Sequence, residues 1–74
     1  IQSKSFSDHM FERFSHNFFV ETLKIKHKDI PLFLQYAEMP AKDLSLFLKS
    51  EYELQLIQYL TEKSKAYKLE NQKE

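Results

Sequence analysis

The stretch IPLFLQYAEMPAKDLSLFL, residues 30–48, decides the fold class. It contains two short apolar-patterned segments separated by Glu38-Met39-Pro40. Pro40 disfavours helical geometry at Met39 and suits the first turn of a following helix. The inner apolar positions have the spacing of a helix-turn-helix, with a small side chain where the helices would approach closely. These positions are Phe33, Leu34, Ala37, Met39, Leu44 and Phe47. We therefore expect an all-α chain with a helix-turn-helix at about 30–48.

The two helices of this motif have recognisable starts. Asp29 is placed to cap the first helix, and Pro31 falls in its first turn, where the missing N–H has no intrahelical partner. The second helix is expected over about 40–48. The predicted apolar side of the first helix is Leu32, Phe33, Tyr36 and Ala37, and that of the second is Leu44, Phe47 and Leu48.

The segment FSDHMFERFSHNFFVETLKI, residues 6–25, holds five of the seven phenylalanines. Its apolar residues recur every four positions, which is helical spacing rather than strand alternation. Ser7 and Asp8 suit a helix N-terminus. We expect one helix over about 8–25, with an apolar face that is mostly core. The recurring residues are Phe6, Met10, Phe14 and Phe18.

Downstream, Ser50-Glu51-Tyr52-Glu53 has the pattern of a capping box. A fourth, longer helix is expected to follow, through Leu54, Ile57 and Leu60 towards Tyr67. Residues 61–74 are almost wholly polar, which predicts a polar C-terminal helix or tail. The whole chain, residues 1–74, is expected to be a single domain, a small helical bundle of about four helices.

Composition excludes several classes of protein. The 74 residues include no Cys and no Gly, which excludes disulfides, thiolate metal sites and glycine-built phosphate loops. The sequence contains no run of about 18 apolar residues that would predict a membrane span, and it does not open with a signal-peptide pattern. We therefore expect a cytoplasmic location with no membrane contact. Because the first residue is not Met, the chain is expected to be a fragment or a processed product.

Residues suited to catalysis or metal binding are few. His9, His16 and His27 are the only soft-metal ligands, and the first two lie about two helical turns apart, too far to chelate together. Glu51 and Glu53 are explained by capping. We therefore predict no enzyme activity, no metal and no cofactor.

The stretch MPAKDLSLFLKSEYELQLIQYL, residues 39–60, resembles the recognition helix and fourth helix of TetR (tetracycline-repressor) family regulators. Lys49 and Ser50 match the family pattern directly, and Leu44 stands at its leucine. Phenylalanines upstream extend the resemblance to about 10–60. The resemblance implies the DNA-binding domain of a transcriptional regulator, a homodimer, and an effector-binding helical domain in a larger parent chain.

Within that resemblance, DNA contacts fall to four residues. Lys42 and Ser45 would read bases, and Lys28 and Lys49 would contact phosphates. If the fold places them on one side, five lysines would form one basic patch: Lys24, Lys26, Lys28, Lys42 and Lys49. Ordinary solvated lysines are the alternative, since the formal net charge is zero and gives no overall attraction to duplex DNA.

A second function, from another class, is a helical protein–protein interaction module without DNA binding. Its surface would be the Phe-rich first helix or the polar tail. For the aromatic stripe we favour the alternative that it is core, because a chain this small needs large side chains to bury enough area. The predicted partners are thus duplex DNA or, in the alternative, another protein.

Overall fold

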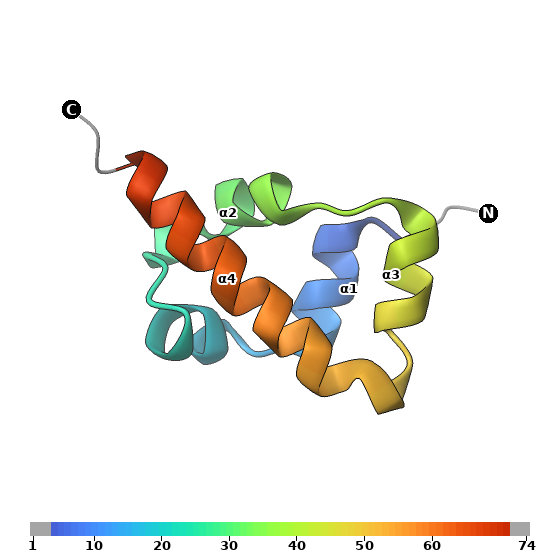
Figure 1. Ribbon diagram of the computed structural model, residues 1–74. Coiled ribbons are helices and arrows are strands. Elements are labelled where there is room, and N and C mark those ends of the chain that lie inside the picture. Colours follow the sequence, from blue (N-terminus) through green and yellow to red (C-terminus); the bar gives the residue numbers. More distant parts are fainter. Residues whose placement is uncertain (1–3, 72–74) are drawn as a thin grey trace.

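The computed structural model describes residues 4–71, and all the secondary structure in that range is helical (Figure 1). The predicted all-α fold of three short helices and a longer fourth is confirmed. Residues 72–74 of the predicted tail lie outside the described residues. The elements are α1 (Phe6–Arg13), a π-helix η1 (Phe18–Thr22), a 3-10 helix η2 (His27–Asp29), α2 (Ile30–Ala37), α3 (Ala41–Phe47), a 3-10 helix η3 (Ser50–Tyr52) and α4 (Glu53–Asn71).

Helix α1 begins at a capping box that lies two residues before the predicted cap. The Asp8 N–H donates to Ser5 Oγ at 3.1 Å, and the Ser5 N–H donates to Asp8 Oδ2 at 3.2 Å. Asp8 therefore acts as the reciprocal partner in the first turn rather than as part of a Ser7 cap.

The prediction of one helix over 8–25 is wrong. The chain leaves helical geometry at Phe14, with φ −127° and ψ 147°, and becomes helical again at His16 and Asn17, which lead into η1. Ser15 explains the interruption, because its hydroxyl and its carbonyl both accept from the Phe18 N–H, at 3.2 and 3.1 Å. A serine that binds nearby backbone in this way competes with continuation of the preceding helix.

The end of η1 turns the chain through a left-handed residue. The Leu23 N–H donates to the Phe18 carbonyl at 3.1 Å and the Ile25 N–H to the Phe19 carbonyl at 2.9 Å. Between them Lys24 adopts φ 62°, a conformation for which glycine is the usual residue. The turn places Leu23 and Ile25 in the core, with at most 2% of each exposed.

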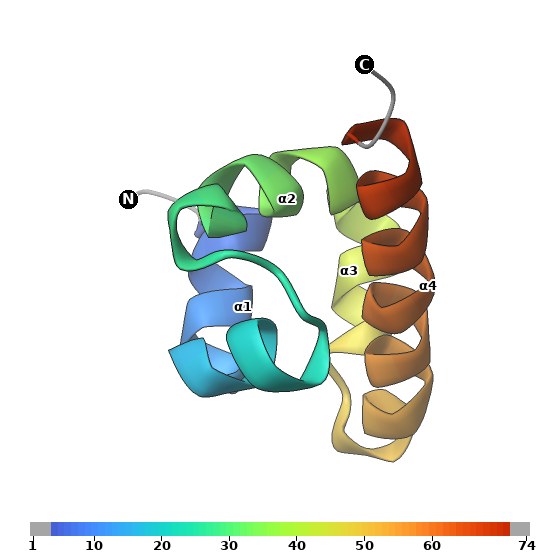
Figure 2. The same cartoon turned by 90° about the vertical axis from the view of Figure 1, so that its left-hand side faces the viewer.

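Helix α2 crosses between α1 and α4 (Figure 2). Its buried residues follow the i, i+3, i+4, i+7 pattern of one helix face. Leu32 was predicted on that face, but it is 57% exposed. Tyr36 is half-buried. The residues of α2 that are wholly buried are Ile30, Phe33, Leu34 and Ala37.

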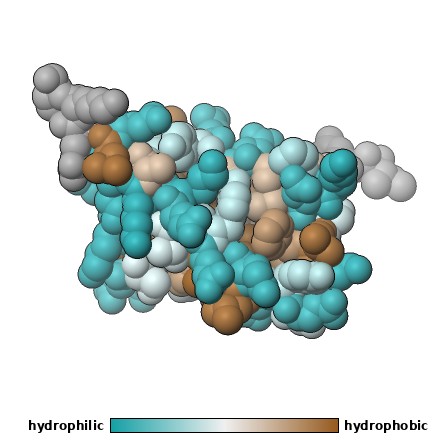
Figure 3. All heavy atoms as spheres, in the orientation of Figure 1, coloured by the Kyte–Doolittle hydropathy of each residue, from teal (hydrophilic) through white to brown (hydrophobic). Residues whose placement is uncertain are grey.

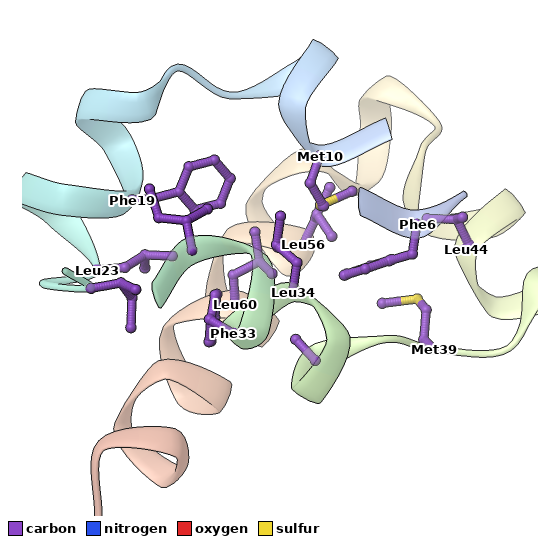
Figure 4. Packing of buried hydrophobic residues seen from close by; sticks show 13 residues of the cluster. Phe6, Met10, Phe19, Leu23, Phe33, Leu34, Met39, Leu44, Leu56 and Leu60 are labelled. Carbon is purple, nitrogen blue, oxygen red and sulfur yellow. The ribbon is translucent and has the colours of Figure 1, made fainter. Parts of the chain in front are cut away.

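The core extends to both sides of α2. In Figure 4, Phe33 and Leu34 lie beside Leu56 and Leu60 of α4. Phe19 and Leu23 fill one side, and Phe6, Met10, Met39 and Leu44 fill the other. One continuous apolar cluster therefore joins all four helices and η1.

The two helices predicted at 30–48 are both present. Asp29 is the N-cap residue of α2, with Pro31 in its first turn, although the Asp29 side chain makes no capping hydrogen bond. An extended link through Glu38 and Pro40 leads to α3, whose Leu44 is buried as expected. Phe47 and Leu48 are half-buried against the same core.

The predicted capping box at Ser50–Glu53 is wrong. Ser50 begins η3, whose N-cap is Lys49, and the Tyr52 N–H donates to the Lys49 carbonyl at 2.9 Å. Helix α4 starts only at Glu53, the residue that would have been the third helical position of the box. The tight turn therefore takes the place of the side-chain cap.

Helix α4 continues through the polar segment to Asn71 and spans the molecule (Figure 1). Its polar half is held by tertiary contacts: Ser64 is only 2% exposed, and the Tyr67 ring lies 5.6 Å from Phe33 and 5.5 Å from Tyr36. Lys68 Nζ donates to the Leu23 carbonyl at 2.9 Å.

Two further side chains bind main-chain carbonyls of distant segments. Arg13 Nη2 donates to the Leu48 carbonyl at 2.5 Å, and the Tyr59 hydroxyl donates to the Ala37 carbonyl at 2.5 Å. Carbonyls at helix ends lack intrahelical partners, so these bonds stabilise the ends of α3 and α2 while fixing their positions. Each contributes about 1 kcal/mol to the free energy of unfolding.

Replacing Lys24 by glycine should stabilise the protein. We expect the free energy of unfolding to rise by about 0.5–1 kcal/mol, because relief of a left-handed backbone outweighs the added entropy of the unfolded chain. Urea denaturation measures it. The control is Lys26→Gly, at φ −60°, which should lower the free energy by about 0.4–1 kcal/mol. A less stable Lys24→Gly protein would contradict this backbone geometry.

Stability should fall at alkaline pH. Burial raises the pKa of Tyr59 above its ordinary 10.0, and the charge of Asp43 adds to this; burial and then Asp29 raise the pKa of Tyr67. The folded state thus holds these protons more tightly than the unfolded state does. This stability is intact below the unfolded pKa and is lost as pH rises through the folded one. Urea midpoints should drop above about pH 10, and less so for Tyr59→Phe; an equal drop would show that Tyr59 is not responsible.

Candidate protein-interaction surface

Aromatic rings gather where α1, η1 and η2 meet. We call five of these residues the aromatic surface: Phe11, Phe14, His16, Phe18 and His27. None of them is wholly buried, since Phe11, His16 and His27 are exposed and Phe14 and Phe18 are half-buried.

The rings of the aromatic surface contact one another in two groups. Phe11 stacks on His16, with centroids 5.5 Å apart and planes at 17°. His16 in turn lies 5.0 Å from His27. Phe14 and Phe18 form a second stacked pair, at 4.4 Å and 17°.

Phe19 anchors the aromatic surface to the core. Its side chain is fully buried, and its ring makes edge contacts with Phe11 at 5.9 Å, Phe14 at 6.3 Å and Phe18 at 5.5 Å. Such edge-to-face pairs add about 0.5–1.5 kcal/mol each beyond burial alone. The outer rings are therefore held in place by their contacts with the core.

The expectation that the Phe-rich stripe is mostly core holds for part of it. Phe6, Met10 and Phe19 are buried, whereas Phe11 keeps 38% of its surface exposed. Exposed aromatic rings on a rigid support are typical of protein-interaction hot spots.

Other exposed apolar side chains are scattered. Those on the helices are Leu32, Leu46, Leu54 and Leu69. Figure 3 shows one face of the molecule, on which hydrophobic residues form separate spots among hydrophilic side chains. Single exposed leucines are normal on soluble proteins and do not define a site.

A shallow depression of about 290 Å³ lies on another side of α1. It is lined by His9, Glu12, Arg13 and Leu48. Arg13 is already bound to the Leu48 carbonyl, so its guanidinium joins α1 to the end of α3. We assign this depression a structural role.

The structure brings His16 against His27, eleven positions along the chain. The sequence spacing had pointed instead to His9 and His16, which lie about two helical turns apart. No local pattern signals this contact, because the turn at Lys24 creates it. Among residues 4–71, no group of three His, Asp or Glu residues is arranged to hold a metal ion. No helix in that range is long and apolar enough to cross a membrane.

The predicted DNA contacts fall in two places. Lys42 and Ser45 are exposed on α3, and Lys49 follows it. Lys28 belongs to η2, at the other end of the molecule (Figures 1 and 2). The structure therefore does not bring the basic residues into the single expected patch, and as DNA contacts the four residues stay a prediction from the sequence.

The comparisons with known proteins identify a family. The family model described as BamP, C-terminal domain, matches residues 3–71, nearly the whole chain. No curated protein and no solved structure matches the chain significantly.

This match overturns the tetracycline-repressor resemblance. A TetR-type DNA-binding domain and a role in transcription regulation are wrong for this chain. The cytoplasmic location is wrong as well, because BamP is associated with the periplasm and with outer-membrane protein assembly. The alternative reading, a helical protein–protein interaction module, agrees better with the family.

Alanine substitutions should separate the exposed rings from their anchor. Phe19→Ala should lower the free energy of unfolding by about 3–5 kcal/mol, enough to unfold much of a protein this small. Phe11→Ala should cost less than about 1.5 kcal/mol, because it loses only part of its burial and its ring contacts. Thermal unfolding followed by circular dichroism measures both. Equal losses would mean that Phe11 is a core residue and not part of a free surface.

Proposed function

Since the chain belongs to the BamP C-terminal domain family, we propose that it is a helical protein-interaction module that binds a component of the outer-membrane protein assembly machinery, the BAM complex, in the periplasm. The observation that carries the proposal is the extent of the family match. Residues 3–71 include every helix of the fold, so the family corresponds to this folded unit and not to a short motif within it.

We assign the binding role to the aromatic surface. It supplies phenylalanine rings, a side chain enriched at protein interfaces, and these rings are supported by the buried ring of Phe19. Support from the core lowers the entropy lost on binding, because the rings are already ordered in the free protein. The other exposed apolar residues, such as Leu32 and Leu54, are single exposed leucines, which are normal on protein surfaces.

The proposal assigns no catalytic step to the chain. The module would act by binding, and its helices would serve as a rigid support for the contact residues. The four helices share one core, so the support is the fold itself. This accounts for the use of so many large aromatic side chains in a chain of 74 residues.

Recovery of BAM components from solubilised cell envelopes tests the proposal. We expect the tagged chain to recover them, and a Phe11→Ala/His16→Ala variant to recover at least about tenfold less, equivalent to about 1.4 kcal/mol. The matched control is Leu32→Ala/Leu54→Ala, which also removes two exposed side chains and should bind like the unaltered protein.

Two results would count against the proposal. If the unaltered chain recovers no BAM component, the family-derived role does not apply to it. If the control variant loses as much binding as the Phe11→Ala/His16→Ala variant, the contact surface lies elsewhere on the helices. Circular dichroism spectra of both variants must match that of the unaltered chain.

A further inference from the structure

A positively charged edge adjoins the aromatic surface. Lys24, Lys26 and Lys28 are exposed in the segment that contains His27, a member of that surface. Among the described residues, none of these three lysines forms an ion pair. Lys68 joins them from α4, since its ammonium group binds the Leu23 carbonyl. We call these four lysines the basic edge.

The charge of the basic edge is only partly offset by neighbours along the chain. The carboxylates in the same stretch are Glu21, which is exposed, and Asp29, which is half-buried at the start of α2. Asp29 lies at the positive end of that helix, where a carboxylate is stabilised by the helix itself. Within residues 21–29, three lysines against two carboxylates leave the segment positive, although the chain as a whole has no formal net charge.

Resting on the proposed function, we propose that the aromatic surface and the basic edge together bind an acidic segment of the partner protein. Apolar side chains of that segment would pack on the rings of Phe11 and Phe18, and its carboxylates would face Lys24, Lys26 and Lys28. His16 and His27, which join the two regions through their ring contact, would lie at the centre of the interface. Charge complementarity of this kind selects the partner and speeds its association.

The same features favour a protein over a membrane as the partner. Clusters of about four to eight Lys or Arg residues are typical of sites that bind anionic membranes. In the basic edge Lys68 is half-buried and bound to the Leu23 carbonyl, which leaves three exposed lysines. Ordered aromatic rings bordered by charged residues match the usual arrangement of a protein interface, an apolar centre with a polar rim.

Charge reversal at the two ends of the molecule tests the proposal. The probe is the host bacterium's BAM complex purified in detergent, and the readout is its dissociation constant for the chain. Lys26→Glu/Lys28→Glu should weaken binding by about tenfold or more. The matched control, Lys42→Glu/Lys49→Glu, changes the net charge equally at the α3 end and should alter binding by less than about twofold.

Salt provides a second readout. Between about 0.01 M and about 0.15 M salt the screening length falls from about 30 Å to about 8 Å. Binding of the unaltered chain should weaken over this range, and binding of Lys26→Glu/Lys28→Glu should weaken less or strengthen. Circular dichroism must show that both double variants are folded.

The other outcomes overturn the proposal in distinguishable ways. If the chain binds the complex and both charge variants bind equally well, the acidic segment is excluded while the proposed function stands. If the chain binds vesicles of equal phosphatidylglycerol and phosphatidylethanolamine as tightly as the complex, with the same loss in Lys26→Glu/Lys28→Glu, the basic edge serves a membrane. If the unaltered chain does not bind the complex at all, the proposed function fails, and this inference fails with it.

Discussion

The packing of α2 against α4 is the contact on which the rest of the structure depends. Helix α2 has eight residues, too few to be stable alone in water. It forms because Phe33 and Leu34 are buried beside Leu56 and Leu60 of the long α4. Helix α1 then covers another side of α2, and η1 closes the end of the same cluster. Loss of this contact would leave each short helix without a buried face.

A chain without glycine must close its turns and helix ends by other means. Lys24 accepts a left-handed backbone, and the carbonyls near helix ends accept from Arg13, Tyr59 and Lys68. These long side chains carry polar groups to distant segments while their stems cover apolar surface. Phe19 likewise has two roles, because its buried ring both fills the core and supports the exposed rings of the proposed interface.

The tetracycline-repressor resemblance followed mainly from positions that govern packing, and the exposed pair Lys49-Ser50 matched as well. Leu44 and Ala37 are buried in this fold, and an apolar spacing of this kind suits many pairs of short helices. It constrains how two helices meet but not what their outer faces contact. The exposed residues Lys42 and Ser45, which would decide DNA recognition, make no packing contact that the apolar pattern could reveal. A pattern of buried residues therefore predicted the helices and misidentified the function.

The sequence by itself determined that the chain is helical, that a break falls at Met39-Pro40, and that Leu44, Ile57 and Leu60 belong to helical segments. These features depend on residues within about one helical turn of each other. Only the tertiary structure decided that α4 continues through the polar residues to Asn71 and that His16 meets His27. The Lys68–Leu23 bond joins residues 45 positions apart. Contacts of that range arise when the core brings distant segments together, and no local periodicity records them.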